Sequence, residues 1–284
     1  MTRITIFTPT YNRAYTLGKL YRSLVAQTNK NFEWLIVDDG STDDTSEIIK
    51  GFVEEKKITI RYYFQNNSGK AIAHNYGVEM THTELFTCVD SDDYLSENAV
   101  EQILHTWDRT INAIGVVAKR IKPDGTDITI MKNDNLLMTL KSAYDSRNIS
   151  GDTFLVYQSS KIKKYKFPHY NDEKFVPEAY LYDKLDQIGK MYLLNKGLYI
   201  SEYLEDGYTK NFDQVIAQNP NGYLAYLKQR LELDTNFKEK YLDNARIISI
   251  SFILKKNRLV KKSWFISLLA YPLGYFLYVK RFRK

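Results

Sequence analysis

The chain has 284 residues, of which 44% are hydrophobic and 14% aromatic, enough to bury a substantial core and to argue against disorder. Its one cysteine, Cys88, excludes a disulfide framework and a Cys-based metal site, which fits a reducing compartment. Residues 1–110 carry 11 basic against 16 acidic side chains, whereas residues 238–284 carry 12 against 2. The acidic amino-terminal half excludes nucleic acid as an expected partner, because binding a phosphate backbone requires distributed cationic contacts.

Short apolar runs alternate with helical patterns over the first hundred residues. Strands are expected at Ile4–Thr8, Phe32–Val37, Ile58–Phe64 and Leu85–Val89, and helices at Tyr15–Gln27, Asp44–Glu54 and Lys70–Met80. Repeated alternation of this kind predicts a parallel sheet covered by helices. A capping box at Asp44 is expected to open the second of these helices. Ser96 is expected to cap a further helix that begins directly after Ser96.

The pattern changes in the middle of the chain. Apolar runs at Ala113–Ala118 and Thr126–Met131 flank the turn signal Lys122-Pro123-Asp124-Gly125, which predicts a hairpin. A helix is expected over Ala179–Ile188, and after Gly207 the pattern is mostly helical. We therefore expect an α/β fold with a helical region at its carboxyl end.

Two acidic clusters directly follow apolar strands. Asp90, Asp92 and Asp93 come after the run that ends at Val89, and Asp38 and Asp39 come after another. Carboxylates at the carboxyl edge of a sheet are hard oxygen ligands, so this pattern predicts Mn²⁺ or Mg²⁺ shared with a phosphorylated ligand. The simpler alternative for the first cluster is an Asp-rich turn that caps the helix after Ser96.

Three segments near these clusters have the residues to bind a nucleotide. The first strand ends in a turn formed by Pro9, Thr10, Tyr11, Asn12 and Arg13. Its backbone and aromatic ring could contact a base, and Arg13 could contact a phosphate. The simpler alternative is an ordinary turn between a strand and a helix, with Arg13 in a surface ion pair. Asp38 and Asp39 could accept hydrogen bonds from a uracil N–H or from ribose hydroxyls. A loop through Asn67 opens a helix at Lys70, which could approach a diphosphate, although the P-loop spacing is absent.

The tail is basic and rich in aromatic residues. Trp264–Val279 is uncharged over sixteen residues, of which thirteen are apolar or aromatic, and Lys261-Lys262 and the basic end at 280–284 flank it. A membrane-spanning helix needs ~17–25 apolar residues. Positive charge on both sides therefore favours a segment that lies in the interface of the cytoplasmic membrane, with a helix packed on the domain as the alternative.

The order of four motifs closely resembles that of the family 2 glycosyltransferases with a GT-A fold. The motifs are Thr-Pro-Thr-Tyr-Asn-Arg at 8–13, Val-Asp-Asp-Gly-Ser-Thr-Asp at 37–43, Asn-x-Gly-Lys-x-x-x-x-Asn at 67–75 and Val-Asp-Ser-Asp-Asp at 89–93. The resemblance covers about residues 3–105, weakens to about residue 203 and is absent from the tail. One departure is His74, which stands where the family usually carries Arg.

The resemblance implies a fold, a donor and a metal. It implies a three-layer αβα nucleotide-binding domain of the GT-A type with a mixed central sheet over residues 1–206, with a donor-binding half at 1–110 and an acceptor-side half at 111–206. Residues 207–284 are then a mainly helical region with the basic tail. It also implies a nucleoside-diphosphate sugar donor, with Asp38 and Asp39 contacting the base. The motif Asp90-Ser91-Asp92 would carry the metal, with Asp92 as the preferred direct ligand.

Attack by an acceptor hydroxyl requires a carboxylate general base. In the resembled family this base comes from an acidic motif in the second half of the domain, and the best match here is Glu178, with Asp172 and Asp183 as reserves. The match is partial because Ala179 stands where a second acid is expected. As the simpler alternative, Glu178 is a first-turn helix acid that the helix dipole stabilises.

The sequence therefore predicts an inverting, metal-dependent glycosyltransferase of the hexosyltransferase type that acts in surface-polysaccharide synthesis. We expect a UDP-sugar donor, a glycan or lipid-linked glycan acceptor and a peripheral location on the inner face of the cell membrane. The strand pattern at Ile4 leaves no room for a secretory signal, which agrees with that location. Two alternatives are a noncatalytic nucleotide-sugar-binding or scaffold protein and a sugar nucleotidyltransferase.

Overall fold

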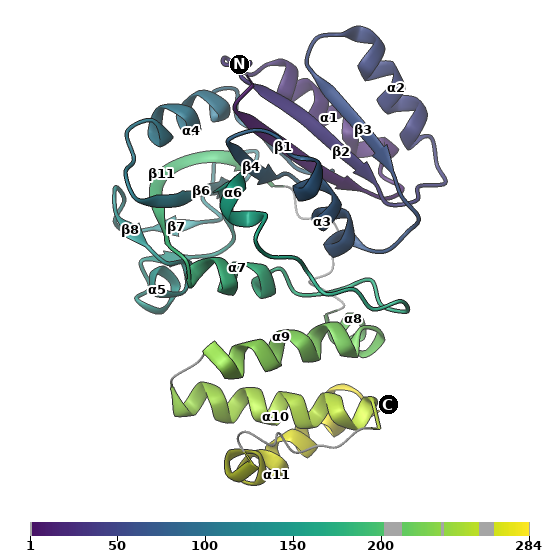
Figure 1. Cartoon of the computed structure of the whole chain (residues 1–284), viewed down its shortest axis with the longest axis vertical. Coiled ribbons are helices and arrows are strands. Elements are labelled where there is room, and N and C mark those ends of the chain that lie inside the picture. Colours follow the sequence, from purple (N-terminus) through teal and green to yellow (C-terminus); the bar gives the residue numbers. More distant parts are fainter. Residues whose placement is uncertain (1, 202–211, 234–235, 256–263, 284) are drawn as a thin grey trace. The chain divides into compact units, whose positions relative to one another are not determined.

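The computed structural model describes residues 2–201, 212–233, 236–255 and 264–283, and its contacts divide the chain into two compact units (Figure 1). The sheet unit comprises Met1–Lys166 and Leu181–Tyr203, and the helical unit comprises Phe167–Tyr180 and Leu204–Lys284. The short segment at residues 167–180 therefore groups with the carboxyl-terminal helices, although it lies within the sheet unit in sequence.

The amino-terminal half of the sheet unit is a parallel sheet. Its strands are β1 (Ile4–Thr10), β2 (Phe32–Asp38), β3 (Ile60–Phe64) and β4 (Leu85–Cys88), in the order β3-β2-β1-β4. The helices α1 (Ala14–Val25), α2 (Thr45–Glu55) and α3 (Lys70–Met80) connect them (Figure 1). The expected βα alternation is confirmed, and the expected bounds of Lys70–Met80 coincide with those of α3.

The helices lie on both faces of this sheet because strand side chains alternate in direction. Ile4 and Ile6 of β1 share a buried cluster with residues of α1 and α2, such as Leu17 and Ile49. Phe7 contacts His74 of α3 instead, with ring centroids 5.7 Å apart. The three-layer αβα arrangement expected from the family resemblance is therefore present.

The second half of the sheet unit makes the sheet mixed. Strand β10 (Thr153–Gln158) pairs antiparallel with both β4 and β6 (Ala113–Ile121), and β11 (Lys190–Ile200) runs parallel to β6. The short strands β5 (Tyr94–Leu95) and β8 (Leu137–Met138) pair with β11. The remaining helices of this half are α4 (Ala99–Trp107), α5 (Leu140–Asp145) and α6 (Ser159–Ile162), and α7 (Ala179–Asp186) begins in the helical unit.

The hairpin expected around Lys122–Gly125 forms only in part. The turn is present, since Gly125 N–H donates to the carbonyl of Lys122 at 2.9 Å. After a single bridge between Ile121 and Asp127, however, the chain turns away, and β7 (Ile130–Met131) pairs with β9 (Ile149–Ser150). The cause is local, because the backbone N–H groups of residues 128 and 129 both donate to the carbonyl of Arg120.

Both expected helix caps are wrong. Asp44 makes no capping bond to α2, and Asp43 accepts instead from the N–H and the hydroxyl of Thr45 at 3.1 and 2.6 Å. Ser96 does not cap α4 either. The side-chain oxygen of Gln27, from the end of α1, accepts the N–H of Val100 at 3.0 Å. A side chain distant in sequence thus satisfies an N–H that has no partner within the helix.

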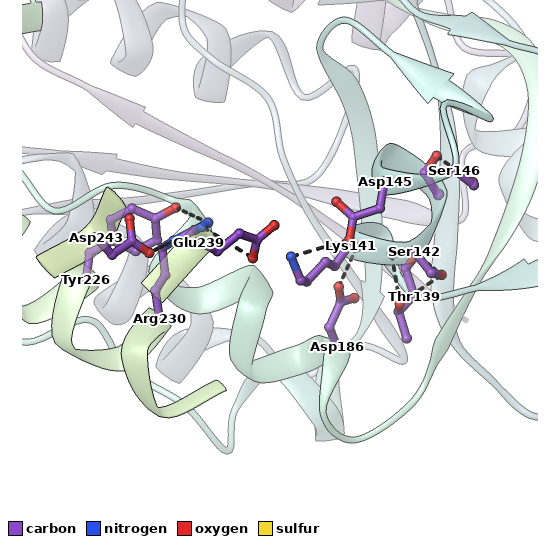
Figure 2. A network of polar contacts seen from close by, with 11 residues as sticks. Thr139, Lys141, Ser142, Asp145, Ser146, Asp186, Tyr226, Arg230, Glu239 and Asp243 are labelled. Carbon is purple, nitrogen blue, oxygen red and sulfur yellow. Dashed lines mark hydrogen bonds and ion pairs between the residues drawn. The ribbon is translucent and has the colours of Figure 1, made fainter. Parts of the chain in front are cut away.

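Asp186 provides a similar distant cap for α5. Its carboxylate accepts the N–H groups of Leu140 and Lys141 at 2.8 and 2.7 Å (Figure 2). Thr139 adds a local cap, since its hydroxyl accepts the N–H of Ser142 at 3.1 Å. Burial raises the pKa of the Asp186 carboxyl, and these two N–H groups oppose that shift.

The helical unit contains α8 (Phe212–Gln218), α9 (Pro220–Leu233), α10 (Phe237–Ile253) and α11 (Trp264–Arg281), which agrees with the expected helical pattern after residue 207. Helix α10 packs between α9 and α11 (Figure 1). Its buried Asp243 pairs with Arg230 of α9 at 2.7 Å, and Arg230 also lies 3.9 Å from Glu239 (Figure 2). Within the described ranges, the apolar helices are too short or too polar to cross a bilayer.

Candidate active site

Parallel register brings the predicted nucleotide-binding segments to one edge of the sheet. Thr10 at the end of β1 lies opposite Asp38 at the end of β2. On the other side of β1, Val89 N–H donates to the carbonyl of Phe7 at 2.8 Å, so the chain after β4 emerges beside the chain after β1. The segments 9–13, 38–41 and 90–93 are therefore neighbours, as the positions of the motifs required.

The turn after β1 is fixed to the turn after β2. Asn12 has a φ of 51°, its N–H donates to the hydroxyl of Ser41 at 2.9 Å, and its side-chain oxygen accepts the N–H of Thr42 at 2.8 Å. Tyr11 remains 48% exposed, so its ring is accessible to a ligand. The predicted contact residue Thr10 is buried, and its hydroxyl has no hydrogen-bond partner in the part of the chain that the structure describes.

Pro9 and Arg13 lie at the two ends of this turn. Pro9 is a buried residue of β1, opposite Val37 of β2. The Arg13 guanidinium donates to the hydroxyl of Tyr15, and its central carbon lies 5.7 Å from the centroid of that ring. Arg13 is thus a cation beside the exposed turn, in agreement with the phosphate contact predicted for it, which stays a prediction.

Asp38 and Asp39 shape the loops around them. The Asp38 carboxylate accepts the N–H of Ser41 at 2.8 Å and the hydroxyl of Tyr62 at 2.9 Å. The pKa of the Tyr62 hydroxyl is raised, mainly by burial and further by this bond. Asp39 accepts from the side chain of Gln65 and from two backbone N–H groups, at 2.7 to 2.8 Å. Oδ1 of Asp39 accepts two of these bonds, from Gln65 and Ser68, whereas its Oδ2 accepts one, from Gly69. The contacts of Asp38 and Asp39 with a base stay a prediction.

Asp39 also holds the loop that leads to Lys70, a predicted phosphate contact. Its carboxylate receives the N–H groups of Ser68 and Gly69, which lie between Asn67 and Lys70. Lys70 is the first residue of α3, and its ammonium nitrogen lies 2.6 Å from a carboxylate oxygen of Asp90. A cation therefore lies directly beside residues 90–93, the acidic turn after β4, where a diphosphate would need one.

Two carboxyl groups of the acidic turn have a raised pKa. Burial first, and then the negative charge of Asp90, raise the pKa of Asp92. The same two causes raise the pKa of Asp93 to about 7. A divalent cation would relieve the repulsion between Asp90 and Asp92. Within the described residues no group of three or more His, Cys, Asp or Glu side chains forms a metal site. Two carboxylates nevertheless fit Mg²⁺ or Mn²⁺, because such ions take their other ligands from water and phosphate.

Ser91 and Asp93 complete this turn. Ser91 is buried between the two predicted ligands. Asp93 turns toward β11, where its carboxylate accepts the hydroxyl of Tyr199 at 2.8 Å and that of Ser201 at 3.3 Å. Tyr199 in turn accepts the N–H of Asp90 at 3.0 Å. One buried tyrosine therefore connects both ends of the acidic turn to the far half of the sheet.

Tyr199 and Arg120 are the residues that sequence reasoning missed. The Arg120 guanidinium carbon lies 4.2 Å from the centroid of the Tyr199 ring, and its nitrogen lies 3.8 Å from the Asp93 carboxylate. The pKa of Tyr199 is raised well above its ordinary value, mainly by burial. The chain has twenty-three tyrosines, and no motif marks this one. Only the pairing of β11 with β5 and β6 brings it to the site.

His74 is buried between two phenylalanines. Its ring lies edge-on to those of Phe7 and Phe86, with centroid distances of 5.7 and 5.3 Å. The residue that departs from the resembled family thus packs between α3 and the sheet.

The candidate general bases belong to different units. Glu178 and Asp172 lie in the helical unit, and both are exposed. Asp183 lies in the part of α7 that belongs to the sheet unit and is half-buried. The structure thus brings together the predicted donor and metal residues within the sheet unit, and the base stays a prediction.

A mixed sheet between helices, with paired carboxylates and the segments predicted to bind a nucleotide at its edge, is the arrangement of a GT-A domain. Residues 5–179 match the model of a family described as "Glycosyl transferase family 2". Because this match spans more than half of the chain, the chain belongs to glycosyl transferase family 2. The family resemblance found in the four motifs is therefore confirmed.

Known proteins extend this comparison. A Rickettsia felis protein described as an uncharacterized glycosyltransferase is 38% identical over 100 residues, which are 35% of this chain and 16% of that protein. The chain thus spans about a sixth of that relative. A Campylobacter jejuni protein named GalNAc(5)-diNAcBac-PP-undecaprenol beta-1,3-glucosyltransferase is 24% identical over 93% of this chain and 79% of its own length.

Two solved structures share the fold. TarS 1-349 of S. aureus in complex with UDP-GlcNAc has a TM-score of 0.64 at 17% identity and covers 98% of this chain and 92% of that one. The mannosyltransferase PcManGT of Pyrobaculum calidifontis in complex with GDP-Man and Mn²⁺ has a TM-score of 0.59 at 14% identity and covers 98% and 87%. Both confirm the predicted fold class.

Proposed function

We propose that this protein is an inverting glycosyltransferase that moves a sugar from a nucleoside-diphosphate sugar, a UDP-sugar in particular, to a hydroxyl of a glycan or lipid-linked glycan. The observation that carries the proposal is the acidic turn at the end of β4, where Asp90 lies 2.6 Å from Lys70. Family membership and the fold shared with TarS bound to UDP-GlcNAc support it.

The donor would be held at the carboxyl edge of the sheet unit. We assign Tyr11, Asp38 and Asp39 to the base and ribose, since the turn after β1 and the turn after β2 are joined by the hydrogen bonds of Asn12. Tyr11 is exposed there, and the two carboxylates are buried at the end of β2. Arg13 and Lys70 are assigned to the diphosphate, because charge-assisted hydrogen bonds to phosphate are strong. Lys70 is already beside the carboxylates at which a phosphate-bound cation would lie.

Asp90 and Asp92 would hold Mn²⁺ or Mg²⁺. When bound, the cation supplies positive charge that stabilises the nucleoside diphosphate as it leaves. Burial first, and then the negative charge of Asp90, raise the pKa of Asp92, and a cation at this place would favour its ionised form. The Mn²⁺ in the complex of the structurally similar PcManGT supports this assignment.

Glu178 is proposed as the general base. In a single displacement the acceptor oxygen bonds to the anomeric carbon while the bond from that carbon to the diphosphate oxygen breaks, and the acceptor proton passes to a carboxylate. Glu178 is exposed and immediately precedes α7. Glu178→Gln is expected to stop turnover and to leave UDP binding unchanged, and full turnover would remove this residue from the mechanism.

The exposed face of α11 supports a membrane surface as a further partner. The large apolar side chains that it exposes are Trp264, Phe265, Leu268, Leu269, Tyr275, Phe276 and Val279. Its buried positions, in contrast, hold the small residues Ser267, Ala270 and Gly274. A Cβ added at Gly274 would lie 2.7 Å from Cβ of Ile248, so small residues are what allow α11 to approach α10.

This distribution is the reverse of that in an ordinary surface helix. We propose that the apolar face lies in the interface of an anionic membrane on its cytoplasmic side, with Lys280 and Arg283 near the headgroups. The name of the Campylobacter relative, which includes PP-undecaprenol, supports a lipid-linked acceptor. The flanking Lys261-Lys262 lies outside the described residues.

Sedimentation with vesicles tests this surface. The double variant Leu268→Gln/Phe276→Gln is expected to lose binding to vesicles that contain phosphatidylglycerol. The matched control Ile111→Gln/Ile130→Gln removes two exposed apolar side chains from the sheet unit and should bind as the wild type does. Equal binding by both double variants would contradict the membrane proposal.

The product of the reaction tests the enzymatic proposal. Incubation with a panel of UDP-sugars and Mn²⁺ should release UDP. Incubation with UTP, a panel of sugar 1-phosphates and Mn²⁺ should release no pyrophosphate. Release of pyrophosphate would indicate a nucleotidyltransferase, and binding without any product would indicate a noncatalytic binding protein. Either result would contradict the proposed transfer.

A further inference from the structure

The segment that carries Glu178 is held by the helical unit. Residues 167–180 belong to that unit by their contacts. Phe167 and Val176 are buried, whereas Glu178 is exposed. The course of the backbone on either side of this glutamate therefore depends on contacts with helices that follow it in sequence.

The first contact joins Glu173 to the start of α9. One oxygen of its carboxylate accepts the backbone N–H and the side-chain amide of Asn221 at 2.8 and 2.7 Å. The other oxygen accepts the N–H of Gly222 at 2.7 Å. The first N–H groups of a helix have no partner within it, and a negative charge is favourable there. Glu173 thus closes the end of α9 and fixes itself to it.

The second contact runs in the opposite direction. Asn219, which precedes α9, accepts the N–H groups of Lys174 and Phe175 with its side-chain oxygen at 2.7 and 3.1 Å. Its amide nitrogen donates to the carbonyl of Val215 at 2.8 Å, which fixes the orientation of the side chain. The segment and the helix therefore cap each other.

Further contacts lie along α9. A Cβ added at Gly222 would lie 2.2 Å from the carbonyl oxygen of Phe175, so the two backbones touch. Beyond Glu178, the buried Gln229 donates to the carbonyl of Tyr180 at 2.8 Å. Helix α9 therefore holds the backbone three residues before Glu178 and two residues after it.

We propose that Glu173, Asn219 and Gln229 are positioning residues that act through Glu178. This inference rests on the base role proposed for Glu178. A general base must lie within ~2.6–3.2 Å of the proton that it removes, and a misplacement of about 1 Å can lower a rate by roughly a hundredfold. The helical unit thereby takes part in the reaction, in addition to any contact with a membrane.

Three variants of the full chain test the role of Asn219. Asn219→Ala removes the acceptor for the N–H groups of Lys174 and Phe175, and Asn219→Asp keeps an oxygen there. Asn236→Ala is a matched control, because Asn236 caps α10 by accepting the N–H of Lys238 at 2.9 Å. Gln229→Ala is a further variant that acts on the other side of Glu178.

Three measurements are made on each variant. These are hydrogen exchange at residues 174–180, the dissociation constant of UDP with Mn²⁺, and kcat and KM for release of UDP from the UDP-sugar on which the wild type is fastest. For Asn219→Ala and Gln229→Ala we expect about tenfold faster exchange and about tenfold lower kcat, with KM and UDP affinity unchanged within about twofold. Asn219→Asp should restore kcat, and Asn236→Ala should change none of these values.

Two results would overturn the inference. One is faster exchange in Asn219→Ala and Gln229→Ala with a wild-type kcat, since the contacts would then be merely structural. The other is wild-type exchange in both variants. Failure of the base assignment is recognised separately, because Glu178→Gln would then turn over normally whatever the exchange measurements show.

Discussion

The sheet unit and the helical unit hold their polar residues by different means. In the sheet unit, Thr10 lies opposite Asp38 because two fully buried parallel strands share a register. In the helical unit, the segment before Glu178 is held by side-chain caps at the start of α9. Register is set by many residues together, whereas a cap depends on one or two. Single polar substitutions should therefore displace the Glu178 segment more easily than the strand ends.

The largest expected effect is on the stability of the helical unit. Asp243 is fully buried and pairs with Arg230 at 2.7 Å and with Arg246 at 2.6 Å. Asp243→Ala removes the partner that both cations share and should destabilise this unit by about 3–5 kcal/mol. Denaturant unfolding measures this loss. Asp213→Ala, which removes an exposed partner of Arg281, is the control and should cost far less.

The next effect concerns catalysis in the sheet unit. Asp92→Asn removes a negative charge with little change of shape and should lower metal-dependent turnover by roughly a hundredfold or more. Asp124→Asn, in the exposed turn before Thr126, is the control. UDP release with Mn²⁺ is the measurement, and turnover within a few fold of the wild type would show that Asp92 does not hold the cation.

The acidic turn should also make stability depend on pH. Burial and Asp90 raise the pKa of Asp93 from 3.8 to about 7, so the folded protein holds a proton that the unfolded chain has released between these values. Stability should therefore fall by about 2 kcal/mol as the pH rises from 5 to 7, and level off above about pH 8. Denaturant unfolding with EDTA measures this slope. Asp93→Asn should reduce this slope, with the remainder due to other carboxyls whose pKa is raised, such as that of Asp92. An unchanged slope in that variant would assign it to other groups.

The smallest expected effect on stability comes from Tyr199, and Mn²⁺ affinity tests whether this residue also positions the acidic turn. Tyr199→Phe removes the hydroxyl that joins Asp90 and Asp93, and should cost about 1–2 kcal/mol. Because the acidic turn is then less constrained, Mn²⁺ should bind more weakly in the presence of UDP. The control is Tyr21→Phe, which removes the bond from another buried tyrosine to Glu55 at 3.0 Å. Equal Mn²⁺ affinity in both variants would contradict a positioning role for Tyr199.

Most of the parallel half of the fold could be predicted because its signals are local. The strands β1 and β2 are continuous apolar runs, and α3 has the bounds expected from its sequence. The neighbouring strand ends then follow from the geometry of a parallel sheet, so the meeting of the Asp38 and Asp90 segments could be expected as well.

Distant contacts could not be predicted in this way. Gln27 caps α4 from 73 residues away, and Tyr199 reaches Asp90 from 109 residues away. Neither contact has a periodic or spacing signal in the sequence. The hairpin after Lys122 is incomplete for a different, local reason: the hydroxyl of Thr129 accepts the N–H of Arg120 at 2.8 Å, which takes the place of a strand pairing.

Anomalous diffraction from crystals of the full chain grown with Mn²⁺ and UDP would decide where donor and metal bind. We expect one manganese peak between the carboxylates of Asp90 and Asp92 and the diphosphate, with the uracil ring beside Tyr11 in the turn after β1 and Asp39 in the turn after β2. Manganese and UDP bound together at another place, or a manganese peak distant from both aspartates, would contradict the proposed site.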